Sequence, residues 1–246
     1  MLNRKFSPSK SRTNHSLNVR KHKINGAKFN STMKTKQEIQ EWFFCIYDKI
    51  ILTISNNKLI YLDNTYSNPE TELTDDNRIL LKDIALINFY LVNEWWKVFW
   101  KSKPDNEIKY EGSINFMPLE QVLYHWDEEF GGNSWSPEMK GFKPLDMFYE
   151  SAGCVGFFID REDKKGLYLY KFDGETQALD IDFEGYLKLL GMSKGYGWWQ
   201  NSLIEIATGI SQPNVKAFKE EMPKIFTNFS WDEFCELYES LRLSKK

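Results

Sequence analysis

The stretch that decides the fold is DIDFEGYLKLLGMSKGYGWWQ, residues 180–200. Asp182 is a good helix N-cap. Apolar side chains then follow at helical spacing, at Phe183, Tyr186, Leu187 and Leu190. This spacing predicts a helix with one apolar stripe, which Gly191 can end. The glycines of KGYGWWQ then predict a tight turn before another helix.

Strong β patterns lie just upstream of this stretch. CVGFFID (154–160) and GLYLYKF (166–172) read as strands joined by the charged turn REDKK. FKPLDMF (142–148) reads as extended chain, and TQALD (176–180) as a further short strand. We expect Phe183, Leu187 and Leu190 to pack against the strands CVGFFID and GLYLYKF.

The first half of the chain is more helical in pattern. Residues 35–50 predict an amphipathic helix with Ile39, Trp42, Phe43 and Ile46 on one stripe. Residues 51–63 predict a hairpin around Asn56-Asn57, and residues 64–78 a polar loop. The apolar run that follows predicts a long helix over 79–100, stopped near Pro104.

The remaining elements complete the pattern. Residues 108–116 predict strand–turn–strand, and PLEQVLYHW (118–126) predicts a helix with Pro118 in its first turn. A last helix begins after the N-cap Ser230, with Glu233 completing a capping box. Helices, then strands, then helices indicate an α+β fold with a mostly antiparallel central sheet covered by helices.

Charge divides the chain into two parts. Residues 1–36 hold ten Lys and Arg and no acid, which leaves 32 − 10 = 22 basic against 35 acidic residues afterwards, a net charge of −13. We predict a disordered basic tail over 1–34 and a single domain over 35–246. A start at Met33 and an organelle transit peptide are alternatives for the tail. The acidic domain is not expected to bind nucleic acid.

The order of motifs in the second half resembles the SUKH superfamily of Smi/Knr-like proteins. The resemblance lies in YEGSINFMPLEQVL, FKPLDMF, CVGFFID and ALDIDFEGYLKLLGMSKGYGWWQ, and it covers residues 108–201. It implies an α+β binding scaffold without family catalytic residues. It further implies an immunity protein that neutralises a polymorphic toxin, with a cell-wall signalling scaffold as the alternative.

Trp198 and Trp199 are the first candidate binding residues. Neighbours on a helix point about 100° apart, so we expect one indole in the core and at most one at a partner surface. The segment KGYGWWQ is then expected mainly to complete the core of the domain.

The acids Asp127, Glu128 and Glu129 are the second candidate. They follow His125, the one histidine outside the tail. A metal site or an acid–base pair would require more ligands or a second titratable partner, so we expect no metal, no cofactor and no catalysis. An acidic surface that meets a basic toxin is the functional hypothesis, and a solvated helix end is the alternative.

Cysteine usage and hydropathy bear on the compartment. Cys45, Cys154 and Cys235 are far apart in sequence, which favours neither a disulfide framework nor a zinc site, and we expect all three to be buried small apolar residues. The most apolar window, residues 84–100, is interrupted by Asn88, Asn93, Glu94 and Lys97. It therefore predicts a core element rather than a membrane span, and a cytosolic compartment is expected.

The sequence thus predicts a cytosolic, non-enzymatic protein-binding module, with a cognate protein toxin as its partner. The residues do not identify the toxin or the oligomeric state. A regulatory scaffold and an enzyme with an unrecognised site are the two competing classes. A toxin-like reading frame beside the gene would favour immunity.

Overall fold

The computed structural model describes most of the predicted domain. The described residues are 35–58, 60–69, 73–105, 109–125, 139–149, 152–159, 161–171 and 176–246. The predicted basic tail, residues 1–34, lies outside these ranges.

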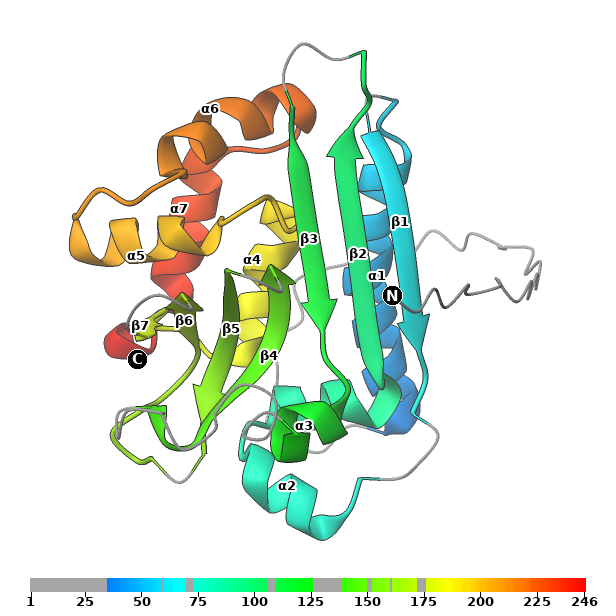
Figure 1. Cartoon of the computed structure of the whole chain (residues 1–246), viewed down its shortest axis with the longest axis vertical. Helices are drawn as coiled ribbons and strands as arrows, with labels where there is room; N and C mark the ends of the chain where they lie inside the picture. The colour runs from blue at the N-terminus through cyan, green and yellow to red at the C-terminus, as the bar shows by residue number, and fades with distance from the viewer. Residues whose placement is uncertain are drawn as a thin grey trace, which may run out of the picture. The chain divides into compact units, whose positions relative to one another are not determined.

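One antiparallel sheet organises the described residues (Figure 1). Its seven strands lie in chain order, so each strand pairs with the next one along the chain. The strands are β1 (Ile60–Ser67), β2 (Trp95–Ser102), β3 (Glu111–Phe116), β4 (Phe142–Tyr149), β5 (Gly153–Phe158), β6 (Tyr168–Lys171) and β7 (Thr176–Ala178). The predicted α+β fold with an antiparallel sheet covered by helices is confirmed.

The helices gather mainly on one face of this sheet, and α1 and α4 lie behind the strands in Figure 1. The described α-helices are α1 (Lys36–Ser55), α2 (Asp75–Leu81), α3 (Ile84–Val92), α4 (Phe183–Ser193), α5 (Gln200–Thr208), α6 (Val215–Ile225) and α7 (Trp231–Leu241). A short π-helix (Gln121–His125) and a 3-10 turn (Leu243–Lys245) complete the described elements.

Strand β2 shows how the sheet separates core from solvent. Trp96, Val98 and Trp100 are buried, while Lys97 and Phe99 between them are exposed. Successive side chains of a strand point to opposite faces, so this alternation shows that one face of the sheet is covered at β2. Strand β5, in contrast, is buried along its whole length.

Helix α4 carries the predicted apolar stripe. Phe183, Leu187 and Leu190 are fully buried. The ring of Phe183 packs edge-on against Phe116 of β3, at 5.7 Å between centroids, and against Phe89 of α3, at 5.4 Å. The helix continues past Gly191 to Ser193, so the predicted end at that glycine is wrong.

The predicted long helix over 79–100 is wrong. The segment forms the end of α2, then α3, and then strand β2. Asp83 separates the two helices because its carboxylate accepts hydrogen bonds from the amides of Ala85 and Leu86, which makes it the N-cap of α3. From Trp95 onward the buried side chains alternate with exposed ones, a strand period that the uniformly apolar composition conceals.

The predicted hairpin around Asn56-Asn57 is also wrong. Helix α1 continues to Ser55, because Ile50 and Ile54 extend the buried stripe begun by Ile39 and Phe43. Asn56 is its C-cap, and β1 begins only at Ile60. The predicted loop over 64–78 therefore contains the second half of β1 and the start of α2.

Three smaller differences concern β3, α6 and the cysteines. The strand–turn–strand predicted over 108–116 is a single strand, β3, in its described part, and α6 was not predicted. Cys154 is buried in β5 as expected, but Cys45 is exposed on α1 and Cys235 is half-buried on α7. A helix position beside aromatic residues in sequence can therefore still face solvent.

Candidate functional site

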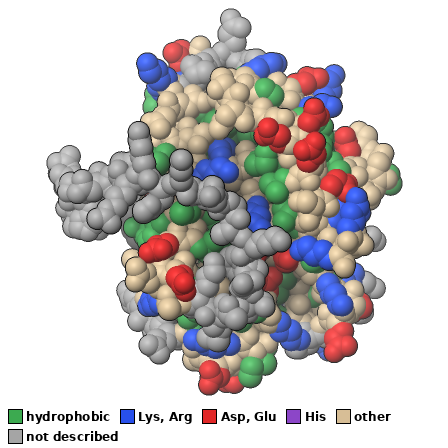
Figure 2. Space-filling model, turned by 180° about the vertical axis from the view of Figure 1, so that it is seen from behind, with side chains coloured by type: hydrophobic (Ala, Val, Ile, Leu, Met, Phe, Trp, Pro, Cys, Tyr) green, Lys and Arg blue, Asp and Glu red, His purple; other side chains and the backbone are tan. Residues whose placement is uncertain are grey.

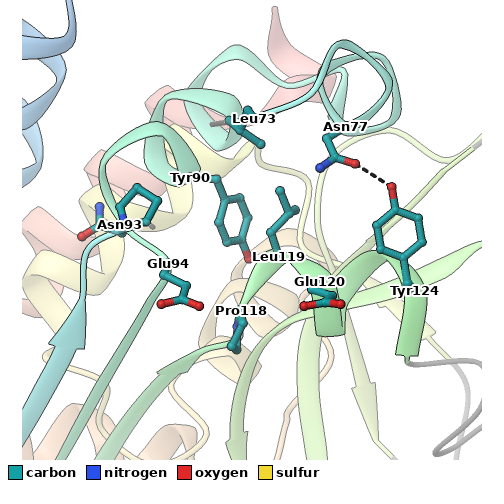
Figure 3. Close-up of a pocket in the computed structure, with 10 residues that line it drawn as sticks. Leu73, Asn77, Tyr90, Asn93, Glu94, Pro118, Leu119, Glu120 and Tyr124 are labelled. Carbon is teal, nitrogen blue, oxygen red and sulfur yellow. Dashed lines mark hydrogen bonds between the residues drawn. The ribbon is translucent and has the colours of Figure 1, made fainter. Parts of the chain in front are cut away.

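A polar pocket of about 420 Å³ opens where the end of β1, the helices α2 and α3 and the π-helix meet (Figure 3). The residues that line it are Pro69, Leu73, Asn77, Tyr90, Asn93, Glu94, Pro118, Leu119, Glu120 and Tyr124. Its two charged lining residues, Glu94 and Glu120, come from segments far apart in sequence. In Figure 3 their carboxylates lie on either side of Pro118, beneath the ring of Tyr90.

The backbone between α3 and β2 positions Glu94. The preceding Asn93 is buried and donates from its side-chain amide to the carbonyl of Phe89, which closes the end of α3. The amide of Glu94 donates to the carbonyl of Ser67 at 2.9 Å. The hydroxyl of Ser67 in turn donates to the Glu94 carboxylate at 2.8 Å. Glu94 is thus fixed to the end of β1 by two contacts.

Two tyrosines frame the rest of the pocket. The Tyr90 hydroxyl donates to the carbonyl of Met117 at 2.9 Å, and burial raises the pKa of Tyr90 well above its usual range. The Tyr124 hydroxyl donates to the Asn77 side chain at 2.6 Å, which links the π-helix to α2 (Figure 3). Tyr90 therefore stays protonated and acts as a fixed wall.

The donor set determines what the pocket can bind. Two carboxylates and the side-chain amide of Asn77 line a space that contains no Lys, Arg or His among its described lining residues, whereas the Asn93 side chain is buried against the end of α3. Carboxylate and amide oxygens accept hydrogen bonds from ammonium and guanidinium groups, and the charge of such groups complements two acids. The pocket is therefore suited to a cationic group, such as a Lys or Arg side chain of a partner.

The predicted acids Asp127, Glu128 and Glu129 lie outside the described residues. The chain enters their segment from the π-helix, whose Tyr124 lines the pocket. Sequence reasoning missed Glu94 and Glu120 as site residues. Glu94 could be located from the sequence, because it directly precedes the alternating run of β2. A residue at the start of a strand lies at the end of the sheet, where side chains from several elements can meet.

The segment KGYGWWQ fills a fork in the sheet. Strands β3 and β4 pair at Phe116 and Asp146 and separate beyond that point. The first half of β3 pairs instead with residues 195–197: the amide of Ser113 donates to the carbonyl of Gly195, and the amide of Gly197 donates to the carbonyl of Glu111. The segment therefore supplies hydrogen-bond partners for the backbone of β3 at the fork, as a neighbouring strand would.

The two tryptophans of this segment lie in the turn before α5. Trp199 is 1 % exposed and packs its ring against Tyr186 and Phe234. Trp198 is half-buried, has a left-handed backbone (φ 61°) and meets the ring of Phe148 edge-on at 5.2 Å. The assumption that both residues are helical is wrong. Of the two indoles, only that of Trp198 keeps an accessible surface.

A network of buried polar side chains lies where β3 and β4 meet. The carboxylate of Asp146, fully buried in β4, accepts hydrogen bonds from the amide of Asn115 at 2.8 Å and from the hydroxyl of Tyr186 at 2.7 Å. The Gln200 side chain donates to the same Tyr186 oxygen at 3.0 Å. Burial raises the pKa of Asp146 to about 6, although both hydrogen bonds favour the charged form. This network ties β4 to β3, α4 and α5.

Figure 2 shows the helix-covered face of the molecule, seen from behind the view of Figure 1. Acidic, basic and hydrophobic side chains are interspersed on its described surface. Within the described ranges, no cluster of three or more His, Cys, Asp or Glu side chains is placed to hold a metal ion. The described helices include none with the length and apolar character needed to span a bilayer.

The sequence matches no protein-family model, and searches of curated proteins and of solved structures found no significant match. The resemblance to the SUKH superfamily therefore stays a prediction that rests on the order of the sequence motifs.

Proposed function

We propose that the protein is a SUKH-type, non-enzymatic, cytosolic binding module that neutralises a basic protein toxin by direct contact. The observation that carries this proposal is the pocket formed by Glu94 and Glu120, whose charged lining is entirely acidic among the described residues. The net charge of −13 from residue 37 onward extends the same preference to the whole domain. Both features favour a partner with exposed Lys or Arg.

The mechanism has an attractive and a steric part. A negatively charged domain raises the rate at which a positively charged protein encounters it. A Lys or Arg side chain of the toxin then enters the pocket and forms charge-assisted hydrogen bonds with the two carboxylates. The body of the domain covers the toxin surface around that side chain and excludes its substrate.

The acids Asp127, Glu128 and Glu129 belong to the same proposal. They continue the chain from the pocket rim and add three negative charges within a few residues of Tyr124. Trp198 is the aromatic candidate contact, because a partly exposed indole packed at one edge is a frequent interface anchor. Trp199 supports the fold from within the core.

The test uses the product of the reading frame next to the gene. Wild-type protein should bind that product in titration calorimetry and protect cells that express it. The variant E94Q/E120Q should bind more weakly, whereas E220Q/E236Q removes two exposed acids from α6 and α7 and serves as the charge-matched control. Absence of binding by the wild type, or equal affinities for the two variants, would contradict the proposal.

A further inference from the structure

A second, larger pocket of about 670 Å³ lies between the α2–α3 junction and the turn that joins β5 to β6. Both segments lie at the lower end of the molecule in Figure 1. Volumes of this size are typical of pockets that enclose small organic ligands. The pocket shares none of its lining residues with the Glu94–Glu120 pocket.

The floor of this pocket is apolar and aromatic. Six buried side chains form it: Leu81, Leu86, Phe157, Phe158, Leu167 and Phe183. They come from four separate parts of the fold, namely α2, α3, the β5–β6 hairpin and the start of α4. Such a floor favours a ligand with an apolar, preferably aromatic body, because burial of that body removes apolar surface from water.

The rim has the opposite charge to the rest of the domain. Lys82, Arg161, Lys164 and Lys165 line the pocket together with the acids Asp83 and Glu162. Arg161 is paired with the adjacent Asp163 at 2.8 Å, so the local balance with that acid included is four minus three, or +1, in a chain whose net charge from residue 37 onward is −13. Lys164 and Lys165 form no ion pair with a carboxylate of the described residues. The ammonium of Lys164 lies 5.6 Å from the centre of the Phe158 ring, where aromatic floor and positive rim meet.

The acid Asp83 is already engaged by the fold. Its carboxylate accepts hydrogen bonds from the amides of Ala85 and Leu86 at the start of α3, and from the amide of Phe183 at 3.3 Å. Three backbone donors offset its negative charge. The second acid, Glu162, is exposed. Lys164 and Lys165 are therefore the rim cations that an anionic ligand can engage at the mouth of the pocket.

We propose that this pocket binds a small molecule that combines an aromatic body with a carboxylate group. The aromatic body lies on the floor beside Phe157 and Phe158. The carboxylate lies at the rim beside Lys164 and Lys165, which provide positive charge next to the apolar floor. This binding site is separate from the toxin-binding surface proposed above and does not depend on it.

The test compares 2-naphthoate with its neutral counterpart, 2-naphthamide, in titration calorimetry against the full chain. Wild-type protein should bind the carboxylate measurably and the amide more weakly. The variant K164Q/K165Q should bind 2-naphthoate roughly five-fold more weakly, as expected when two partly exposed charge interactions are lost. The control K216Q/K224Q removes two exposed cations from α6 and should bind as the wild type does.

Amide chemical-shift mapping locates the bound molecule independently of affinity. The shifts caused by 2-naphthoate should fall at residues 81–86 and 157–167, and all variants should melt as the wild type does because the four lysines are not core residues. No binding at millimolar concentration would overturn the proposal. Equal affinity for acid and amide, equal loss in both lysine pairs, or shifts located elsewhere would overturn it as well.

Discussion

Two glycines show how closely single residues are constrained at the fork between β3 and β4. A methyl group on Gly112 would lie 2.3 Å from the indole of Trp100, and that indole is held by a hydrogen bond to the carbonyl of Lys194. Gly195 has φ 70°, and a methyl group there would lie 2.7 Å from the carbonyl oxygen of Ser113. Both contacts lie where KGYGWWQ pairs with β3, so the glycines of this region serve packing between backbones.

The first prediction compares two Gly→Ala substitutions. Gly112→Ala should lower the free energy of unfolding by about 1–3 kcal/mol, because the added methyl overpacks a fixed indole. Gly191→Ala should raise it by roughly 0.5–1 kcal/mol, because Gly191 lies inside α4 and an added Cβ would meet no atom within 4 Å. Urea unfolding of the two variants measures both signs. A destabilised Gly191→Ala or an unaffected Gly112→Ala would be inconsistent with this packing.

The second prediction concerns the buried carboxylate of Asp146. Its pKa is about 6 in the folded protein and 3.8 in the reference state, so the folded form retains a proton that the unfolded form releases. The resulting stabilisation is complete below about pH 4 and is lost as the pH rises through 6. The stability of the wild type relative to Asp146→Asn should therefore fall by up to about 3 kcal/mol between pH 4 and 7.

Unfolding measured by urea at several pH values gives this difference. Asn keeps an acceptor for the Asn115 amide but does not titrate, so the variant isolates the charge. A difference between the two proteins that stays constant from pH 4 to 7 would show that Asp146 is not buried as described.

At the level of elements, sequence patterns predicted the second half of the fold better than the first. Strands β5 and β6 and helix α4 were predicted because their patterns are local and are separated by turn residues. Strand β2 was read as helix because EWWKVFWKS is apolar enough to hide its alternation, and its pairing with β1 and β3 is a long-range contact. The acidic pocket depends on that same boundary, so it was not predicted either.

The third prediction tests the covered face of the sheet. Leu187→Ala in α4 should lower the free energy of unfolding by about 2–5 kcal/mol, because the side chain is fully buried and its loss leaves a cavity. The neighbouring Lys188→Ala should cost less than about 1 kcal/mol, since Lys188 is exposed and its ion pair is with Glu184 on the same helix. Similar losses for both variants would mean that α4 does not cover the sheet as described.

At the level of the whole molecule, the core and the charged pocket lie in different parts of the described fold. The antiparallel sheet and its fork provide a rigid frame, in which Trp199 and Asp146 are core residues. The composition predicted an acidic domain, but not the pocket proposed here for a basic partner, because Glu94 and Glu120 are 26 positions apart in sequence (120 − 94) and converge only through folding. A resemblance in motif order cannot supply such a position.

The most direct test of the central claim is the rate at which the product of the neighbouring reading frame associates with this protein, measured at several salt concentrations. The variant E94K/E120K should associate more slowly than wild type, with a shallower dependence on salt, because it reverses the charge of the pocket. The charge-matched control E220K/E236K should retain most of the wild-type rate. Equal rates for the two variants, or rates that do not depend on salt, would contradict recognition of a basic partner at this pocket.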